Sequence, residues 1–331
     1  MKNILNSLFE YKTLSAVQSQ QLFRGIVAGK YNEAQIASLM TVFLMRNISI
    51  EELAGFRNAL LEFSTPIDFG DNNYIDIVGT GGDGKDTFNI STCSAVVVAA
   101  AGYRVVKHGN YGASSVSGAS NVMEQHGVQF SSNLDQYRRS LDECNLAYLH
   151  APIFNTAMKQ VATVRKNLGI RNFFNMLGPM INPASPRYQL LGTYNLAMQR
   201  LYCYMFQRNE INFAVVHSLD GYDEISLTSP FKVVTPSKER IYTPEELGFT
   251  PSRQEELFGG SSVESAAEIF DKVLNGTASI YQQNCVVANA AFAINLIEPH
   301  LSIEQAIDKA TQAIKSGAAK SCFQKFINLN S

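Results

Sequence analysis

The first 65 residues carry apolar side chains at the three- and four-residue spacing that is typical of amphipathic helices. After Asn32, for example, apolar residues recur at Ile36, Leu39, Met40, Phe43 and Leu44. Three pairs have the capping-box spacing that marks a helix start: Ser15 with Gln18, Asn32 with Gln35, and Ser49 with Glu52. The pattern predicts a small helical domain over residues 1–65, and helices from about 155–185 are expected to join it.

After residue 70 the pattern changes to short runs that are rich in β-forming residues, at 74–78, 103–107 and 213–217. Between the first two lies Cys93–Ala101, which is apolar nearly all round and predicts a buried helix. Strands that alternate with helices indicate parallel βαβ units. We therefore expect an α/β domain over residues 70–331 with a mainly parallel central sheet. Ligands of such sheets bind beyond the carboxyl ends of the strands.

Two later segments carry helix-start signals. Thr243-Pro244-Glu245-Glu246 combines a capping residue, a proline at the first helical position and a capping-box glutamate. Ser302 to Ile314 has helical apolar periodicity and is followed by Gly317 as a stop signal.

Composition excludes several classes of protein. The chain has 331 residues, of which 46% are hydrophobic and 17% charged, so a full core is expected rather than disorder. The formal net charge is −2, so the chain lacks the excess of positive charge that is typical of proteins that bind nucleic acid or an anionic membrane. The five cysteines are scattered and never form a Cys-x-x-Cys pair, which favours a reducing compartment. With no signal segment at the N-terminus, a cytoplasmic protein is expected.

A glycine-rich turn, Gly79-Thr80-Gly81-Gly82-Asp83-Gly84, follows the first strand. It has the spacing of a dinucleotide fingerprint, but no carboxylate lies between Cys93 and Asn121 to hold a ribose hydroxyl. It also approaches a P-loop, but Asp86 follows Lys85 where the motif requires Ser or Thr. The remaining interpretations are an ordinary strand-to-helix turn and a nest of backbone amides that binds an anion.

Two further loops favour the anion-binding interpretation. The loop after the second strand offers the cation of Lys107 and the hydrogen-bond donors Asn110, Ser114, Ser115 and Ser117. The loop after the third strand contains Asp223-Glu224. Adjacent carboxylates beside a phosphate site are explained by Mg²⁺, which binds one or two carboxylates together with substrate oxygens. The residues thus indicate a phosphorylated ligand and a magnesium ion.

Taken in order, these motifs resemble the anthranilate phosphoribosyltransferase family over nearly the whole chain. The resemblance rests on the segments Gly79–Asp83, Thr87–Thr92, Lys107–Asn110, Ser114-Ser115, Ser117-Gly118, Ala157–Lys159, Val164-Arg165, Phe174–Pro179, Asn182-Pro183 and Asp223–Ser226. It implies a homodimer of the nucleoside phosphorylase/phosphoribosyltransferase fold type. It also implies transfer of the phosphoribosyl group of phosphoribosyl diphosphate to the amine of anthranilate, as in tryptophan biosynthesis.

The resemblance also implies roles for individual residues. Phosphoribosyl diphosphate is expected to be bound by Gly79, Gly82, Asp83, Thr87, Asn89, Ile90, Ser91, Thr92, Lys107, His108, Gly109, Asn110, Tyr111, Gly112, Ala113, Ser114, Ser115 and Ala119. Anthranilate is expected to contact Gly79, Asn110 and Arg165, and Mg²⁺ to bind Ser91, Asp223 and Glu224. Arg165 suits the anthranilate carboxylate because a guanidinium can bind a carboxylate through two hydrogen bonds. No general base is assigned.

The chain departs from the usual family pattern at Tyr111, Val116, Asn121, Asn155 and Gln160. Two other functions stay open from the sequence. A pyrimidine nucleoside phosphorylase shares the architecture and a related lysine-and-serine loop, but it has no need of the Asp223-Glu224 magnesium site. A non-catalytic sugar-phosphate sensor would keep the loops but would need no site for an amine acceptor. Arg165 is evidence for such an acceptor site and therefore against the sensor.

Overall fold

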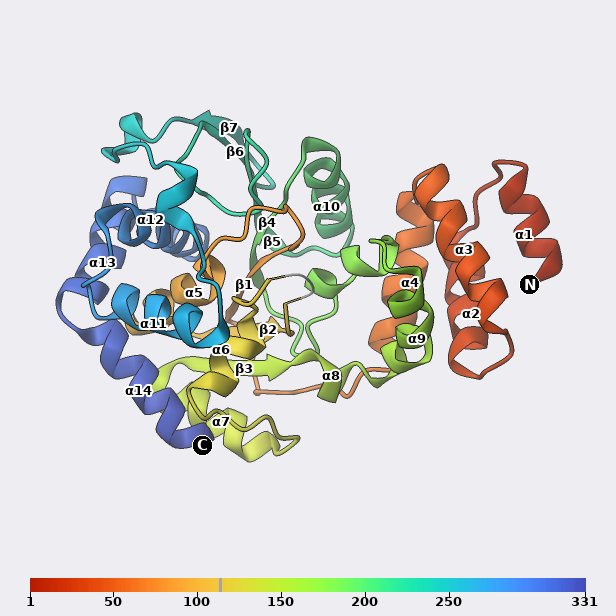
Figure 1. Ribbon diagram of the computed structural model, residues 1–331, viewed down its shortest axis with the longest axis horizontal. Coiled ribbons are helices and arrows are strands. Elements are labelled where there is room, and N and C mark those ends of the chain that lie inside the picture. The colour runs from red at the N-terminus through yellow and green to blue at the C-terminus, as the bar shows by residue number, and fades with distance from the viewer. Residues whose placement is uncertain (113–114) are drawn as a thin grey trace. The chain divides into compact units, whose positions relative to one another are not determined.

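The computed structural model describes residues 1–112 and 115–331, and the chain divides into two compact units (Figure 1). The helical unit consists of Met1–Ile67 and Pro152–Pro183. The α/β unit consists of Asp68–Ala151 and Ala184–Ser331. Each unit is described by itself below.

The helical unit contains four N-terminal helices, and three of them begin at the predicted capping boxes. The helices are α1 (Lys2–Phe9), α2 (Ala16–Val27), α3 (Glu33–Met45) and α4 (Ile50–Glu62). Ser15, Asn32 and Ser49 each accept a hydrogen bond from the backbone of the residue three positions on, and that residue's side chain accepts from the cap. The second segment adds α9 (Lys159–Leu168) and the 3₁₀ turns η1 (Thr156–Met158), η2 (Phe173–Met176) and η3 (Gly178–Met180). The short helix α8 (Ala151–Phe154) begins at the boundary.

A cluster of phenylalanines explains why the two chain segments fold as one unit. Phe43 and Phe56, from α3 and α4, lie 4.9 and 4.7 Å from Phe173, measured between ring centroids. Phe23 of α2 lies 5.8 Å from Phe174. All five rings are buried. Contacts of this geometry add roughly 0.5–1.5 kcal/mol per pair to the burial of the rings, so η2 is part of the helical core.

A buried ion pair lies in the same unit. Glu52 accepts hydrogen bonds from Arg46 and from the backbone amides of Leu14 and Ser49. The side chains of Glu52 and Arg46 are 0% and 7% exposed. Burial acts to raise the pKa of Glu52, but the hydrogen bonds outweigh it, so the pKa of this carboxyl lies below its usual value of 4.5. The carboxylate therefore ties the chain before α2 to the start of α4.

We predict that Glu52→Ala lowers the free energy of unfolding by about 3–5 kcal/mol, because it leaves Arg46 buried without its partner. Glu62→Ala is the matched control, since its ion pair with Arg24 is exposed, and a much smaller loss is expected. Denaturation followed by circular dichroism measures both. Because the folded pKa of Glu52 lies below the unfolded one, its contribution is full above pH 4.5 and is lost as the pH falls through the folded pKa. Equal losses in the two variants would contradict the prediction.

The α/β unit is built on a seven-stranded sheet in the order β3-β2-β1-β4-β5-β6-β7. The strands are β1 (Ile75–Gly79), β2 (Val105–Gly109), β3 (Leu146–His150), β4 (Tyr188–Gly192), β5 (Asn212–Ser218), β6 (Phe231–Val234) and β7 (Glu239–Tyr242). The first five are parallel, and β6 and β7 form an antiparallel extension. The mainly parallel sheet predicted from the sequence is confirmed.

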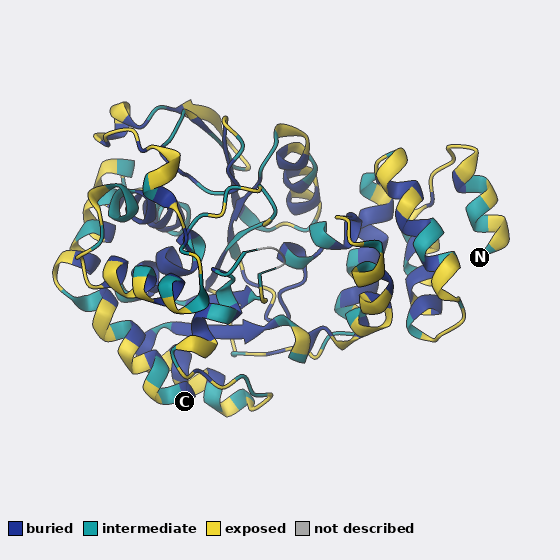
Figure 2. Ribbon diagram, in the orientation of Figure 1, coloured by how far each residue is buried: buried dark blue, intermediate teal, exposed yellow. Residues whose placement is uncertain are grey.

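Helices of this unit are α5 (Ile90–Ala100), α6 (Ala119–Gln125), α7 (Leu134–Cys144), α10 (Leu196–Arg208), α11 (Val263–Leu274), α12 (Ile280–Ile297), α13 (Ile303–Lys315) and α14 (Ala318–Asn330). The predicted burial of α5 is confirmed, because every residue from Thr92 to Ala99 is buried, and α12 packs against it. Figure 2 shows the parallel strands β1 to β5 and the inner sides of these helices mainly in the buried colour, whereas β7 is mostly exposed. The core thus lies between the sheet and the helices around α5.

The order of the strands fixes where a ligand site can form. The chain leaves β1 for β2 on one side, whereas β4 pairs with β1 on the other side. Ligands of open α/β sheets bind at such a switch point, beyond the carboxyl ends of the strands. Gly79 and Gly192 are the last residues of β1 and β4 and are directly paired. The glycine turn therefore begins at the switch point.

One predicted helix and four strands differ from the sequence predictions. Thr243 and Glu246 form the expected reciprocal hydrogen bonds, but they start only the 3₁₀ turn η4 (Glu245–Leu247) rather than a full helix. Gly248 follows in the left-handed conformation and ends it. Strands β3, β4, β6 and β7 were not predicted. Within the described residues, no helix has the length and apolarity needed to span a lipid bilayer.

Candidate functional site

The carboxylate of Asp223 occupies a space that two glycines leave open at the switch point. A Cβ atom added to Gly79 would lie 2.5 Å from Oδ2 of Asp223 and 3.1 Å from Oε1 of Glu224. A Cβ atom added to Gly192 would collide with the backbone carbonyl of Asp223. Residues 219–226, the third loop, can therefore reach the ends of β1 and β4 only because both strands end in glycine.

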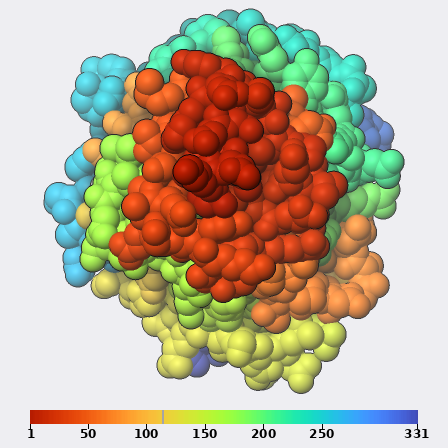
Figure 3. Space-filling model, turned by 90° about the vertical axis from the view of Figure 1, so that its right-hand side faces the viewer, coloured from red at the N-terminus to blue at the C-terminus, as the bar shows by residue number. Residues whose placement is uncertain are grey.

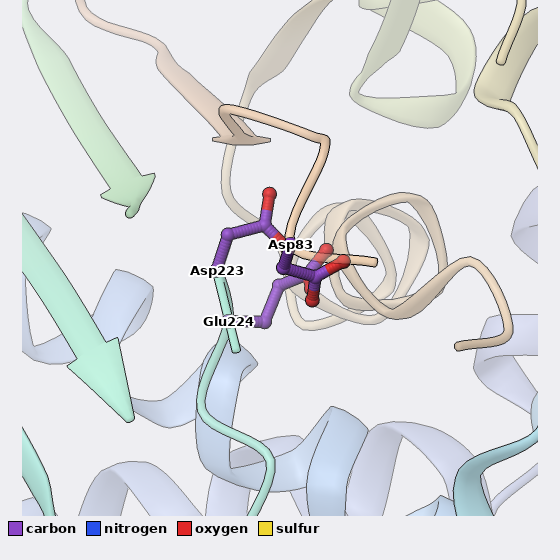
Figure 4. Close-up of side chains that lie close together, drawn as sticks. All are labelled: Asp83, Asp223 and Glu224. Carbon is purple, nitrogen blue, oxygen red and sulfur yellow. The ribbon is translucent and has the colours of Figure 1, made fainter. Parts of the chain in front are cut away.

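Three carboxylates converge at this point (Figure 4). Asp83, Asp223 and Glu224 each offer an oxygen within 4.8 Å of the other two, which is close enough for one cation to bind them together. Among the hydrogen bonds of the described residues, Oδ2 of Asp83 and Oε2 of Glu224 have no partner, although both atoms are buried. Buried carboxylate oxygens without a donor are costly, so the donor set fits a bound divalent cation.

The pKa shifts reflect the same crowding. Burial, and after it the charge of Asp83, raises the pKa of Asp223 to about 6. Burial and the neighbouring Asp223 raise the pKa of Glu224 well above its usual value. Both carboxyl groups resist ionisation because like charges are held together away from water. A cation among them would remove this penalty.

The glycine turn has a backbone conformation that glycine adopts far more readily than other residues. Gly81, Gly82 and Gly84 all have positive φ angles, between 73° and 79°, which side chains larger than hydrogen rarely permit. The amide of Gly81 donates to Oδ2 of Asp223 at 2.5 Å, and the amide of Lys85 donates to Oδ1 of Asp83. The turn therefore holds the carboxylates directly with its backbone, which an ordinary strand-to-helix turn would not do.

The residues after the turn form the start of α5. Asn89 caps the helix, because its Oδ1 atom accepts from the amide of Thr92, and Ile90 is the first helical residue. The Nδ2 atom of Asn89 donates to the carbonyl of Ser117, and the hydroxyl of Ser117 donates to the carbonyl of Thr87. The first loop (residues 79–88) and the second loop (residues 110–117) are thus joined beside a helix N-terminus, where an anion is favoured.

Lys107 is a buried cation on β2. The residue is 2% exposed, and its ammonium donates to the carbonyl of Ile77 and, at 3.4 Å, to the hydroxyl of Ser91. Burial lowers the pKa of Lys107, whereas the charges of Asp76 and Glu224 act to raise it. Lys107 therefore carries the positive charge that balances the acidic cluster from the adjacent strand.

Residues 110 and 112 of the second loop are bonded to the start of α6. The amide of Ser120 donates to the carbonyl of Asn110, and the amide of Gly112 donates to Oδ1 of Asn121. His108 and Gly109 complete β2, and Ala119 is the first residue of α6. Ser115 lies within hydrogen-bond distance of Ser117. Ala113 and Ser114, which were also predicted to bind phosphoribosyl diphosphate, lie outside the described residues.

Arg165, predicted to bind anthranilate, belongs to the helical unit. It lies in the last turn of α9 and is half-buried. Burial lowers the pKa of its guanidinium. Gly79 and Asn110, the other two residues of that prediction, belong to the α/β unit.

Sequence reasoning missed parts of this arrangement. Asp83 was assigned only to phosphoribosyl diphosphate, but the structure places it in the acidic cluster with Asp223 and Glu224. Gly192 was missed because β4 was not recognised, although Tyr-Gln-Leu-Leu-Gly is a short β-forming run that ends in glycine. Asp76, fully buried on β1, accepts from the amide of His108, and its charge acts to raise the pKa of Lys107. A carboxylate inside an apolar strand was the available signal for it.

Comparison with known families agrees with this architecture. Residues 2–64 match the helical bundle domain of a glycosyl transferase family, and residues 71–320 match the α/β domain of a glycosyl transferase family. The fold and the site therefore define a glycosyltransferase with these two domains.

Similar proteins of known sequence identify the family within the glycosyltransferases. The chain is 59% identical over 330 residues to an anthranilate phosphoribosyltransferase of Bacteroides fragilis strain YCH46, with 100% of both chains covered. It is 48% identical to that of Christiangramia forsetii, covering 100% of this chain and 99% of the relative. The chain belongs to the anthranilate phosphoribosyltransferase family, which confirms the resemblance seen in the motifs.

Solved structures show the same fold. The crystal structure of anthranilate phosphoribosyltransferase from Thermus thermophilus has a TM-score of 0.91 at 29% identity, with 98% of each chain covered. The enzyme from Saccharomyces cerevisiae in complex with PRPP and Mg has a TM-score of 0.90 at 26% identity, covering 98% of this chain and 96% of that chain.

We predict that Gly79→Ala lowers the affinity for Mn²⁺, used as a probe for Mg²⁺ in the presence of phosphoribosyl diphosphate, by about tenfold or more, because the new methyl displaces Asp223. Gly178→Ala is the control, since a Cβ atom there meets no described atom within 4 Å. Paramagnetic resonance titration measures the bound ion. Unchanged Mn²⁺ affinity in Gly79→Ala would show that the glycine is not needed to seat the carboxylates.

Proposed function

We propose that the chain transfers the phosphoribosyl group of phosphoribosyl diphosphate to the amine of anthranilate, and that Mg²⁺ acts as its cofactor. The products are N-(5-phosphoribosyl)anthranilate and diphosphate. One observation carries the proposal: three converging carboxylates, two of them with buried unpartnered oxygens, lie at the switch point of a sheet whose loops are built to hold an anion. A diphosphate ester can share such a site with carboxylates only through a cation.

The acidic cluster provides the ligands for the cation. Asp83, Asp223 and Glu224 would hold Mg²⁺, with Ser91 as a further oxygen near Lys107. When bound, Mg²⁺ acts as a Lewis acid that offsets the charge on the departing diphosphate. The cluster itself binds through oxygen atoms only, which is the donor set that magnesium prefers.

The two phosphate loops hold the sugar donor in position. Backbone amides of the glycine turn and the N-terminus of α5 favour an anion, and Lys107 supplies a buried positive charge. The hydrogen bonds through Asn89 and Ser117 fix the first loop against the second. The residues that these bonds join are therefore held in place before the substrate arrives, which reduces the entropy that binding must offset.

In the transfer, the bond between the anomeric carbon and the diphosphate oxygen breaks, and a bond to the anthranilate nitrogen forms. The nitrogen then loses one proton. Arg165 binds the anthranilate carboxylate, and Gly79 and Asn110 contact the acceptor. Holding the amine close to the anomeric carbon supplies much of the rate enhancement. An aromatic amine is already nucleophilic, so no residue is assigned as a general base.

A homodimer is part of the proposal. The helical unit exposes large apolar side chains, including Phe9, Tyr11, Val17 and Met45, which are 58%, 78%, 61% and 81% exposed. The N-terminal helices that carry them are coloured red to orange on the face shown in Figure 3. Exposed apolar surface of this kind is typical of a protein–protein interface and supports self-association.

The assay that separates this function from its two alternatives uses the fluorescence of anthranilate. We expect the fluorescence to fall when the protein, Mg²⁺ and phosphoribosyl diphosphate are all present, and to stay constant when any one is omitted. Release of free base from uridine or thymidine with phosphate, and no loss of anthranilate, would instead identify a pyrimidine nucleoside phosphorylase. Binding of phosphoribosyl diphosphate without turnover of any of these substrates would identify a sensor.

We predict that the double variant Asp223→Asn with Glu224→Gln lowers kcat/KM by about 100-fold or more at saturating Mg²⁺, because neutral amides bind the cation poorly. Steady-state rates over a Mg²⁺ titration measure the effect. A wild-type response to Mg²⁺ in the double variant would refute the metal assignment. Asp220→Asn is the matched control in the same loop, because its carboxylate bonds to Thr228 and Ser229 instead.

For Arg165→Ala we predict that KM for anthranilate rises about 10-fold or more, whereas KM for phosphoribosyl diphosphate changes less than about twofold, because a charge-assisted hydrogen bond to the carboxylate is lost. Lys166→Ala, the neighbouring cation on α9, is the control. Equal increases in both KM values would indicate that Arg165 is structural.

A further inference from the structure

Tyr111 lies in the second loop, and its side chain turns back onto the fold. It is 42% exposed, yet its hydroxyl donates to Oε1 of Glu124 on α6 at 2.7 Å. The rings of Tyr111 and His150 pack edge to face, with their centroids 5.0 Å apart and an angle of 79° between the ring planes. Glu124 accordingly raises the pKa of the Tyr111 phenol to about 12. The side chain therefore contacts two different elements, α6 and the end of β3.

The surface that Tyr111 contacts is itself rigid. The ring of His150 stacks on Phe130 with centroids 4.1 Å apart at 9°. Its Nδ1 atom lies 2.8 Å from the hydroxyl of Ser120, which lies 2.7 Å from the hydroxyl of Tyr148. His150, Ser120 and Tyr148 are all buried. The ring of Tyr111 therefore packs against a buried side chain, whereas its hydroxyl bonds to Glu124, which is exposed.

The backbone beside Tyr111 depends on the same surface. A Cβ atom at Gly109 would collide with the hydroxyl of Tyr148, so β2 ends in direct contact with this cluster. Asn110 accepts from the amide of Ser120 and its own Oδ1 atom accepts from the amide of Tyr111. The amide of Gly112 donates to Asn121. Residues 109–112 are thus fixed on both sides of Tyr111.

We propose that Tyr111 is a positioning residue, which ties residues 109–112 to α6 and β3 through Glu124 and His150 and so keeps this segment ready to bind phosphoribosyl diphosphate. The inference rests on the proposed function for the identity of the ligand. It differs from direct recognition, because the hydroxyl of Tyr111 is already bonded to Glu124. Without this link residues 109–112 sample more conformations, and binding must order them again.

The role predicts a specific kinetic pattern. Tyr111→Phe keeps the ring contact with His150 and removes the hydrogen bond to Glu124, so Kd and KM for phosphoribosyl diphosphate should rise about 3- to 10-fold. Neither kcat nor KM for anthranilate at saturating phosphoribosyl diphosphate should change by more than about twofold, because the bound substrate has already ordered the loop. Tyr111→Ala removes both contacts and should have the larger effect.

Substitution of Glu124 distinguishes a tether from direct contact. Glu124→Ala should reproduce the effect of Tyr111→Phe, and the double variant should be no worse than either single variant, because both remove the same bond. Glu124→Gln retains an acceptor oxygen and should restore most of the affinity. If Tyr111→Phe weakens binding and Glu124→Ala does not, Tyr111 touches the substrate directly and the proposal is wrong.

Tyr103→Phe is the matched control. The hydroxyl of Tyr103 also takes part in a side-chain hydrogen bond, which it accepts from Lys309, but Tyr103 lies before β2 and outside the second loop. An equal loss of affinity in Tyr103→Phe, or unchanged affinity in Tyr111→Phe, would overturn the proposal. Calorimetry of phosphoribosyl diphosphate binding with Mg²⁺ keeps this test separate from the proposed function. If the wild-type protein binds phosphoribosyl diphosphate but does not convert anthranilate, the proposed transferase function is wrong. Comparing the Kd for phosphoribosyl diphosphate between the wild-type protein and the Tyr111 variants still tests the role of Tyr111.

Discussion

The structure depends on the placement of like charges at one point of the sheet. Asp83, Asp223 and Glu224 hold their carboxylates together, and Asp223 is nearly fully buried. Such a cluster is unfavourable by itself, as the raised pKa values of Asp223 and Glu224 show. A divalent cation among the three carboxylates would remove this cost, and the cation would in turn attract a diphosphate. In the proposed function, the electrostatic cost in the free protein is what gives the site its preference for a metal-bound anion.

The surrounding fold supports this cluster in three ways. Gly79 and Gly192 end neighbouring strands and leave the space that the third loop fills. Lys107 and Asp76 place opposite charges inside the adjacent strands, so that the buried ammonium is balanced by a carboxylate rather than by solvent. Hydrogen bonds through Asn89 and Ser117 join the first loop to the end of the second. The sheet, the glycines and the loops together set the geometry on which the transfer depends.

Much of the fold could be predicted from the sequence because its signals are local. The capping boxes of α2, α3 and α4, the apolar helix α5 and the strands β1, β2 and β5 follow from residue spacing alone. Strand β4 was missed although it lies at the switch point, because its role depends on pairing with β1, which is far away in the sequence. Thr243–Glu246 shows the opposite error, since a correct cap did not produce a full helix before Gly248. Local signals define where elements begin, but long-range pairing decides which of them form the site.

For the site, the sequence identified the glycine turn, Lys107 and the Asp223-Glu224 pair, but it could not show that Asp83 completes the cluster. In the proposed function, these carboxylates make binding of the sugar diphosphate depend on a cation. Calorimetry of phosphoribosyl diphosphate binding, with Mg²⁺ and then with a chelator, measures this dependence. We expect Mg²⁺ to strengthen binding by at least about tenfold, equivalent to roughly 1.4 kcal/mol. Equal affinity with and without Mg²⁺ would contradict it.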